Sequence, residues 1–433
     1  MIRKGLLKEL IVTFQELIPT QLYERKVVVP VDTGKVVALR GVRRCGKSSI
    51  MQLCINFLLE SGVRREQILF INFDDERLHF DLSEFDLIVE SYQELYPDVI
   101  FSDVYVFFDE IQTNKSWEQF VRRLYDQHTK HIFITGSNSK MLSSEIATSL
   151  RGRTLQYEVL PLSFTEYCHF AGLETKVYSG TTKPKLKKAF NEYLCYGGFP
   201  EVVLMKHEYY DRILQEYYFV MLYKDLVERY ELKNISAIKY FINRMLINVS
   251  KPTSINKIYN ELKSHGISVS KNTLYELVDH LEAIYFFLPV KKYEPSFVKQ
   301  VSSDKKYYCI DNGLRKSLSQ SYQDDHGLLL ENSVFLWLRS KIDMSSGIYY
   351  YKGNKECDFV VVNGSVVSEL IQVCWDISEK STFEREIQGL LEAAQKLQCN
   401  NLLIITNDED RFVEVDDYRI SIVPAWRCFL VGE

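Results

Sequence analysis

Short runs of apolar residues alternate with helical patterns through the first part of the chain. The apolar runs cover residues 36–40, 68–73, 104–110, 131–137 and 154–162. Each run is continuous rather than alternating, as expected for strands that are buried on both faces. Strands that alternate with helices form a parallel sheet with helical crossovers. The pattern therefore predicts an α/β fold with a parallel sheet.

Helical periodicity takes over after Pro161. We expect a loop at 179–188, because Gly, Pro and Lys interrupt the periodicity there. Short helices followed by extended segments are expected from about 236 to 310, and strands return after residue 328 with runs such as CDFVVVNG and NLLIITN. These later residues therefore predict a second α/β unit.

The composition excludes several classes of protein. Hydrophobic residues make up 46% and charged residues 26% of the 433 positions, which predicts a globular chain with several folded domains. No apolar run approaches the roughly 20 residues of a membrane-spanning helix, and the N-terminal helical pattern contains Lys and Glu, so we expect neither membrane insertion nor secretion. The nine Cys lack CxxC spacing, which favours reduced thiols and a cytoplasmic location.

A phosphate-binding motif follows the first apolar run. Residues 41–48 read GVRRCGKS, which fits G-x-x-x-x-G-K-[ST], and they stand between an expected strand and a helical pattern. In such a loop backbone N–H groups surround the phosphates, Lys47 neutralises their charge and Ser48 ligates Mg²⁺. We predict that ATP and Mg²⁺ bind through these positions: Gly41, Val42, Arg43, Arg44, Cys45, Gly46, Lys47, Ser48 and Ser49.

Two carboxylates end the third apolar run. Asp109 is expected to hold Mg²⁺, and Glu110 to polarise the water that attacks ATP. The alternative is a strand that merely ends in a solvated pair of acids. The pair follows the glycine-rich loop by about 60 residues, and this placement favours the catalytic interpretation.

Two further positions are ambiguous. Asn138, or Ser137 beside it, follows the fourth apolar run and either senses the γ-phosphate or caps the next helix. Arg153 either reaches a neighbouring subunit's γ-phosphate as an arginine finger or is a surface residue in a turn, and the sequence alone favours the turn. Arg43 and Arg44 are open between phosphate contact and subunit contact. We count Asn138 and Arg153 with Lys47 and Glu110 as candidate catalytic residues.

Several segments together resemble a known group of proteins. They are GVRRCGKSS, FFDEIQ, ITGSNSKML, RGRTLQYEVLPLSFTEY, YGGFPEVV, LLENSVFLWLR, ECDFVVV and LIQVCWD. The group comprises AAA+-like P-loop ATPases of archaeal and bacterial type whose second half has a restriction-endonuclease-like core. The resemblance implies an ATPase core at 1–165, a helical lid at 166–232, a winged helix at 233–310 and a nuclease-like α/β domain at 311–433. It also favours Arg153 as the finger residue.

The expected winged helix contains candidate contacts to nucleic acid. Residues 254–281 predict a helix, a turn and a second helix, and IYFFLPVKKY would form the wing. Twelve Lys and Arg oppose six Asp and Glu from Lys233 to Lys306, although the whole chain has a net charge of −5. The alternative is a unit that docks a protein partner or has a purely architectural role. The candidates for DNA or RNA contact are Lys271, Asn272, Tyr275, Lys291 and Lys292.

The last domain resembles a nuclease that lacks one essential group. Glu331, Asp358 and Gln372 have the spacing of PD-(D/E)XK nucleases, whose carboxylates hold Mg²⁺ and whose Lys stabilises charge at the phosphate. Cys374, a neutral thiol, stands where the Lys is expected. The resemblance therefore predicts a catalytically silent domain. Residues that could substitute lie at other spacings: Lys352, Lys355 and Lys380 for the charge, and Glu369 as an added carboxylate.

Two classes of function remain open. The first is an Mg²⁺-dependent ATPase that drives or switches an oligomeric machine acting on nucleic acid. The second is a nucleotide-gated scaffold that docks a protein partner without contacting nucleic acid. A third, an active Mg²⁺-dependent DNA nuclease, conflicts with Cys374.

Overall fold

The computed structural model describes residues 4–17, 22–138, 150, 152–318, 325–343 and 345–432. The chain divides into two compact units, one of residues 1–160 with 283–285 and the other of residues 161–282 with 286–433. Each unit has its own sheet and is described by itself. No helix within the described ranges is both long and apolar enough to cross a membrane. The finer four-part division of the chain remains a prediction.

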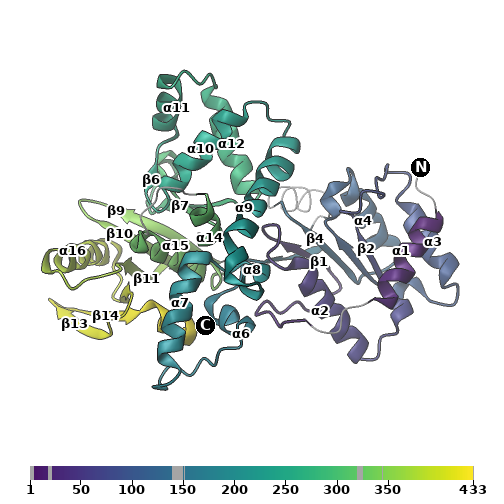
Figure 1. Cartoon of the computed structure of the whole chain (residues 1–433), viewed down its shortest axis with the longest axis horizontal. Helices are drawn as coiled ribbons and strands as arrows, with labels where there is room; N and C mark the ends of the chain where they lie inside the picture. Colours follow the sequence, from purple (N-terminus) through teal and green to yellow (C-terminus); the bar gives the residue numbers. More distant parts are fainter. Residues whose placement is uncertain are drawn as a thin grey trace. The chain divides into compact units, whose positions relative to one another are not determined.

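The first unit is built on the parallel sheet that the apolar runs predict (Figure 1). Its five strands lie in the order β2-β3-β4-β1-β5, and every neighbouring pair is parallel. The strands are β1 (Val36–Arg40), β2 (Ile68–Asn72), β3 (Tyr105–Asp109), β4 (Ile132–Gly136) and β5 (Thr154–Glu158). Because β4 lies between β1 and β3, the segments that follow β1 and β3 meet at one edge of the sheet.

Helices bury the faces of this sheet. Side chains of α1, α3 and α4 form one hydrophobic core with side chains of the strands, as continuous apolar runs require. The helices are α1 (Lys4–Glu16), α2 (Lys47–Glu60), α3 (Asp86–Leu95) and α4 (Trp117–Gln127), with short 3₁₀ turns η1 (Arg65–Gln67), η2 (Phe101–Asp103) and η3 (Ile111–Thr113). The unit thus provides a rigid support for the loops at its strand ends.

The second unit begins with helices that contain the PLSFTE and GGFP motifs and show a structural role for both. Ser163 caps α6 through the amide of Glu166, and the Glu166 carboxylate accepts a hydrogen bond from the Ser163 amide, which is a capping box. The amide of Leu162 donates to the carbonyl of Gly198. The elements are α6 (Phe164–Phe170), α7 (Lys183–Tyr196), α8 (Pro200–Leu204), η5 (His207–Tyr209), α9 (Tyr210–Val220) and the π-helical η6 (Met221–Glu228). The PLSFTE and GGFP motifs therefore pack together.

A nine-stranded mixed sheet runs through the rest of the second unit. Its order is β13-β14-β12-β11-β10-β9-β7-β8-β6. The earlier elements are α10 (Ile235–Ile247), β6 (Pro252–Thr253), α11 (Ile255–Ser264), α12 (Lys271–Ala283), β7 (Phe287–Lys292), α13 (Phe297–Ser302) and β8 (Lys305–Cys309). Strand β7 pairs antiparallel with β8 and parallel with β9, so the predicted wing is continuous with the strands that follow it. The winged-helix interpretation itself remains a prediction.

The later elements complete this sheet. They are α14 (Asn312–Ser317), α15 (His326–Arg339), β9 (Ser346–Lys352), β10 (Glu356–Asn363), β11 (Val366–Val373), α16 (Lys380–Leu397), β12 (Leu402–Thr406), β13 (Arg411–Val415), β14 (Tyr418–Pro424) and α17 (Ala425–Val431). Side chains of α16 form a core with β10, β11, β12 and β14. The strand runs predicted after residue 328 are therefore found, as part of a sheet that also includes β6, β7 and β8.

Candidate functional site

The glycine-rich loop joins β1 to α2 at the carboxyl edge of the first sheet. Gly46 has a φ of 99° and Arg44 a φ of 68°, so the chain turns sharply through left-handed conformations before α2 begins at Lys47. Gly41 packs so tightly that an added Cβ would lie 2.1 Å from the carbonyl oxygen of Val159. The motif glycines are therefore required by the backbone path of the loop.

Arg25 fastens this loop from outside the motif. Its Nη1 donates to the carbonyl of Cys45 over 2.7 Å, and its Nη2 donates to the carbonyl of Leu160 over 3.0 Å. The guanidinium thus ties the glycine-rich loop to the segment after β5. The sequence analysis missed Arg25, because no motif marks a residue that contacts the loop only in the folded chain.

The structure brings Ser48 and Asp109 together. The Ser48 hydroxyl donates to Asp109 Oδ2 over 2.7 Å, and the Thr135 hydroxyl donates to the other carboxylate oxygen. Burial and the neighbouring Glu110 charge raise the pKa of Asp109 above its ordinary value. A hydroxyl beside a carboxylate is an oxygen donor set that suits Mg²⁺, so these two residues fit the ion that the motif implies.

Lys47 is buried at the first turn of α2, with 4% of its surface exposed. Its Nζ donates to the carbonyls of Gly41 and Val42 over 3.1 and 3.0 Å, and lies 3.4 Å from Glu110 Oε1. Burial lowers the pKa of Lys47, but Glu110, Cys45 and Asp109 together outweigh it and the pKa is raised overall. The ammonium is therefore charged at neutral pH, as phosphate binding requires.

Two neighbours besides Lys47 hold Glu110 at the carboxyl edge of the first sheet. Its backbone adopts a left-handed φ of 50°, and its amide donates to the Thr135 hydroxyl over 2.9 Å. Its Oε2 accepts a hydrogen bond of 2.6 Å from Gln112 Nε2, which also lies 3.4 Å from the Ser137 hydroxyl. Burial alone would raise the pKa of Glu110, but Lys47, Arg43 and Gln112 lower it to about 2. The carboxylate is thus ionised at neutral pH.

Gln112 and Thr135 were missed by the sequence analysis. Gln112 is buried, and its Oε1 has no hydrogen-bond partner among the described residues. A signal for Gln112 was present, because it ends the FFDEIQ segment two positions after Glu110. Thr135 lies inside an apolar strand, where nothing in the sequence separates it from an ordinary core threonine.

The remaining candidates occupy different places around this site. Asn138 is fully buried just after β4, at the same edge of the sheet. Arg43 lies 3.4 Å from Asp74. Arg153 immediately precedes β5, and its Nη2 lies 3.2 Å from the Asp126 carboxylate. Because β5 is parallel to β1, Arg153 lies at the opposite edge of the sheet from the glycine-rich loop.

Several uncharacterized proteins match this chain over nearly its whole length. The uncharacterized protein MJ1544 of Methanocaldococcus jannaschii is 36% identical over 422 residues, which are 95% of this chain and 91% of that protein. The chain belongs to the MJ1544 family. A second relative, an uncharacterized protein of Haemophilus influenzae, is 28% identical over 413 residues, which are 95% of this chain and 98% of that protein.

Family models identify the first unit of this MJ1544-family chain. Residues 33–168 match a model described as an AAA domain, and residues 187–325 match a domain of unknown function (DUF8612). The AAA match spans all five strands and the glycine-rich loop, so the first unit is an ATPase domain of the AAA class with a P-loop. The resemblance of residues 311–433 to nucleases remains a prediction.

Two solved structures have only a distant likeness to the MJ1544-family chain. C. elegans PCH-2 has a TM-score of 0.29 at 12% identity and covers 49% of this chain and 61% of its own. Cdc6p from Pyrobaculum aerophilum has a TM-score of 0.26 at 11% identity and covers 77% of this chain and 94% of its own. Such low TM-scores support no argument about fold or function.

A second cluster of charged residues surrounds Lys306 in the later unit of the MJ1544-family chain. Only 1% of Lys306 is exposed, and its Nζ lies 3.3 Å from Glu331, 2.8 Å from Glu356 and 3.3 Å from Asp358. The Tyr308 hydroxyl also donates to Glu331 over 2.8 Å. The structure therefore brings together two of the nuclease-like candidates, Glu331 and Asp358, around a lysine of β8 that the sequence analysis missed.

Gln372 lies in the same cluster. Its Oε1 accepts from the amide of Asp358 over 3.2 Å, and its Nε2 donates to Glu386, which pairs with Arg385 at 2.6 Å. Burial and the charge of Glu331 raise the pKa of Asp358 to about 7. Among the described residues, no group of three or more His, Cys, Asp and Glu is arranged to hold a metal ion. In this cluster the carboxylates converge on an ammonium.

The expected substitutes for the missing lysine lie elsewhere. Lys352 pairs with Glu356 at 3.1 Å on the exposed side of the cluster. Lys380 pairs with Glu384 at 3.7 Å, and among the described residues no hydrogen bond or ion pair joins Lys355 or Glu369 to Asp358. Burial raises the pKa of Cys374 to about 11, so its thiol carries no charge at neutral pH.

The nucleic-acid candidates are on the surface. Lys271, Asn272 and Tyr275 are exposed on the first two turns of α12, and Lys271 Nζ lies 5.8 Å from the centre of the Tyr275 ring. Lys291 is exposed on β7, whereas Lys292 pairs with Glu294 at 2.6 Å. Among the described ion pairs, Lys271 and Lys291 therefore have no acidic partner, whereas Lys292 has one.

Proposed function

We propose that this chain is an Mg²⁺-dependent ATPase that works as an oligomer and whose second unit acts on nucleic acid. The observation that carries the proposal is the meeting of two pairs at one sheet edge. Ser48 and Asp109 lie 2.7 Å apart, and Lys47 and Glu110 lie 3.4 Å apart. These four residues combine phosphate binding, metal binding and water activation in one place.

Each residue has a distinct part in the proposed hydrolysis. The loop N–H groups and Lys47 bind the phosphates of ATP. Ser48 and Asp109 hold Mg²⁺, which neutralises charge on the β- and γ-phosphates. Glu110 is ionised, so it accepts a hydrogen bond from the attacking water and orients it. Gln112 and Thr135 fix the position of Glu110 through the contacts described above.

Two substitutions test this assignment. Lys47→Ala should abolish ATP binding, measured by isothermal titration calorimetry, because it removes the buried phosphate-binding charge. Glu110→Gln should keep binding and reduce turnover about 10²- to 10⁴-fold, because the amide accepts no proton from water. If both variants lost binding equally, the role of Glu110 as base would be wrong.

Oligomeric action is proposed from the position of Arg153. A residue at the opposite sheet edge cannot reach the γ-phosphate in its own chain, so it could act only in a neighbour's site. The alternative role is structural, because Arg153 pairs with Asp126 and lies 5.6 Å from the Tyr125 ring. Mixing Arg153→Ala chains with Lys47→Ala chains tests this, because sites completed across subunits regain turnover only in the mixture.

Contact with nucleic acid is proposed from the exposed face of α12. Lys271 and Tyr275 offer an ammonium beside an exposed ring, a combination suited to phosphates and bases. DNA should stimulate ATP turnover several-fold, and the stimulation should weaken with added salt. Lack of stimulation would favour the alternative function, in which ATP controls docking to a protein partner.

Lys306 favours nuclease activity as a second candidate function. It supplies a buried positive charge beside Asp358, which is the property that Cys374 lacks. Mg²⁺-dependent cleavage of DNA that disappears in Asp358→Ala would support this candidate. An unchanged DNA substrate in Mg²⁺ and in Mn²⁺ would leave Lys306 with a structural role alone.

A further inference from the structure

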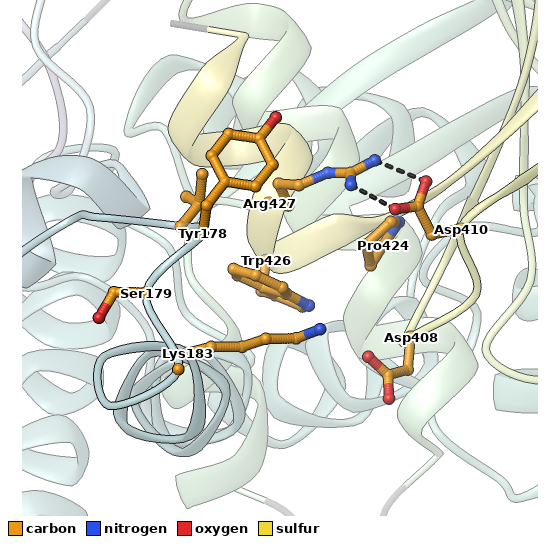
Figure 2. Close-up of a pocket in the computed structure, with 10 residues that line it drawn as sticks. Tyr178, Ser179, Lys183, Asp408, Asp410, Pro424, Trp426 and Arg427 are labelled. Carbon is orange, nitrogen blue, oxygen red and sulfur yellow. Dashed lines mark hydrogen bonds and ion pairs between the residues drawn. The ribbon is translucent and has the colours of Figure 1, made fainter.

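The second unit contains a cavity of about 270 Å³ (Figure 2). Tyr178 and Lys183, from the loop before α7 and its first turn, line one side. Trp426 and Arg427, from the first turn of α17, line the other side together with Asp408 and Asp410. The volume lies near the lower end of ligand pockets, which are roughly 300–1,000 Å³, so it suits a small molecule or the end of a larger one.

All but one of the charges that line this cavity are paired. The Asp410 carboxylate binds both terminal nitrogens of Arg427, and Asp408 pairs with Lys187. Lys183 is exposed, and Figure 2 draws no ion pair between it and Asp408 or Asp410. The cavity therefore presents one unpaired ammonium within the part of the chain that the structure describes.

A buried donor lies beside that ammonium. Trp426 is 3% exposed, and its indole N–H has no hydrogen-bond partner among the described residues. Lys183 Nζ lies 5.9 Å from the centre of the Trp426 ring. Figure 2 shows the Lys183 side chain beside the Trp426 ring, and an exposed lysine side chain changes rotamer within nanoseconds, so movement of Lys183 opens an approach to the N–H. One acceptor group between the two donors would satisfy both.

We propose that this cavity binds a phosphate group attached to a planar ring, the chemistry of a nucleoside monophosphate. Different oxygens of one phosphate accept from the Lys183 ammonium and the Trp426 N–H. The Tyr178 ring is 86% exposed, so a ligand base can stack on it. The source is either a free mononucleotide or the 5′-phosphorylated end of a nucleic-acid strand. This site is separate from the P-loop and goes beyond the proposed ATPase function.

Calorimetric titration of the full-length Lys47→Ala variant with AMP tests the proposal. This variant removes the phosphate-binding lysine of the P-loop, so the remaining binding reports on the second unit. AMP should bind at one site per chain, and adenosine at least tenfold more weakly, because it lacks the phosphate. If this variant folds poorly, Lys47→Met, which keeps an unbranched side chain of similar length, takes its place and should give the same result. Absence of AMP binding in both proteins would overturn the proposal.

Three further substitutions assign the binding to this cavity. Lys183→Met should weaken AMP binding at least tenfold, because it removes the unpaired charge. Trp426→Phe should weaken it several-fold, because it removes the N–H and keeps an aromatic ring. Lys185→Met is the matched control, since this exposed lysine is on the same helix but does not line the cavity. AMP binding that Lys183→Met leaves unchanged would overturn the assignment.

A final comparison separates the two sources of the phosphate. A short single-stranded oligonucleotide is titrated with and without a 5′-phosphate. Tighter binding of the phosphorylated strand than of AMP, lost in Lys183→Met, supports a strand end as the ligand. Equal binding of the two strands, with AMP bound more tightly than either, supports a free nucleotide. If the Lys183→Met variant bound AMP and both strands as tightly as the unmodified chain does, the proposed site would be wrong.

Discussion

Two buried lysines, one in each unit, face carboxylates in different ways. Lys47 donates to two main-chain carbonyls and lies 3.4 Å from the single carboxylate of Glu110. Lys306 lies within 3.3 Å of three carboxylates and has no such carbonyl contact among the described hydrogen bonds. Neutral carbonyls can release a lysine to a phosphate at little electrostatic cost, whereas three carboxylates cannot. The comparison indicates a binding role for Lys47, whereas Lys306 stabilises the fold whether or not its cluster also cleaves DNA.

The largest expected effect is on folding. Lys306→Met should lower the free energy of unfolding of the second unit by about 3–5 kcal/mol, because it leaves three carboxylates facing one another without their shared cation. Urea unfolding followed by tryptophan fluorescence measures this, since three of the four Trp are in this unit.

Lys305→Met provides the matched control for that measurement. Lys305 neighbours Lys306 on β8, is partly exposed and lies 3.5 Å from Glu282, so its loss should cost no more than about 1 kcal/mol. Lys47→Met should likewise destabilise the chain less than Lys306→Met does. Equal losses in the Lys306 and Lys305 variants would remove the distinction between the two lysines.

The contributions of Asp358 and Glu110 to stability should also change with pH in opposite directions. The pKa of Asp358 is raised to about 7 by burial and by Glu331, so the folded unit keeps a proton that the unfolded chain releases near pH 4. Stability of the second unit should therefore fall, by on the order of 4 kcal/mol, as pH rises from about 4 to 7. Glu110, with a pKa lowered to about 2, contributes stability that is lost only as pH falls below about 4.

Comparison of urea midpoints at several pH values checks this prediction. Asp358→Asn removes the titrating group, so its midpoint should depend less on pH than that of the unmodified chain. Asp311, whose pKa burial also raises to about 7, provides the same dependence in both proteins. Identical pH profiles would show that Asp358 ionises normally.

The smallest expected effect concerns Gln112. Gln112→Leu keeps the size of the side chain but removes the 2.6 Å hydrogen bond to Glu110. Turnover of ATP should fall about tenfold with KM unchanged, because Gln112 positions Glu110 and does not touch the phosphates. Gln119→Leu, at an exposed position of α4, should leave turnover unchanged. A raised KM with unchanged turnover would assign Gln112 to binding instead.

The contrast between the P-loop and the Lys306 cluster also explains which site residues could be identified from the sequence. The P-loop is contiguous, so its residues could be recognised from spacing, and the continuous apolar runs predicted the strands of the first sheet. Lys306 precedes Glu331 by 25 positions and Asp358 by 52, and only the folded second unit, in which α15 packs against β8 and β11, brings them together. Spacing from Cys374 therefore could not identify Lys306. Arg25 and Thr135 were hidden for the same reason, because their partners are distant in the sequence.

The placement of Arg153 constrains the symmetry of any assembly in which it serves another chain. It lies at the amino edge of the first sheet, and the glycine-rich loop lies at the carboxyl edge. In a two-fold pair both edges must lie in one self-complementary patch, so that each copy's Arg153 meets the other copy's loop. A donor on one side and an acceptor on the other instead generate a head-to-tail series, which closes as a ring or extends as a filament.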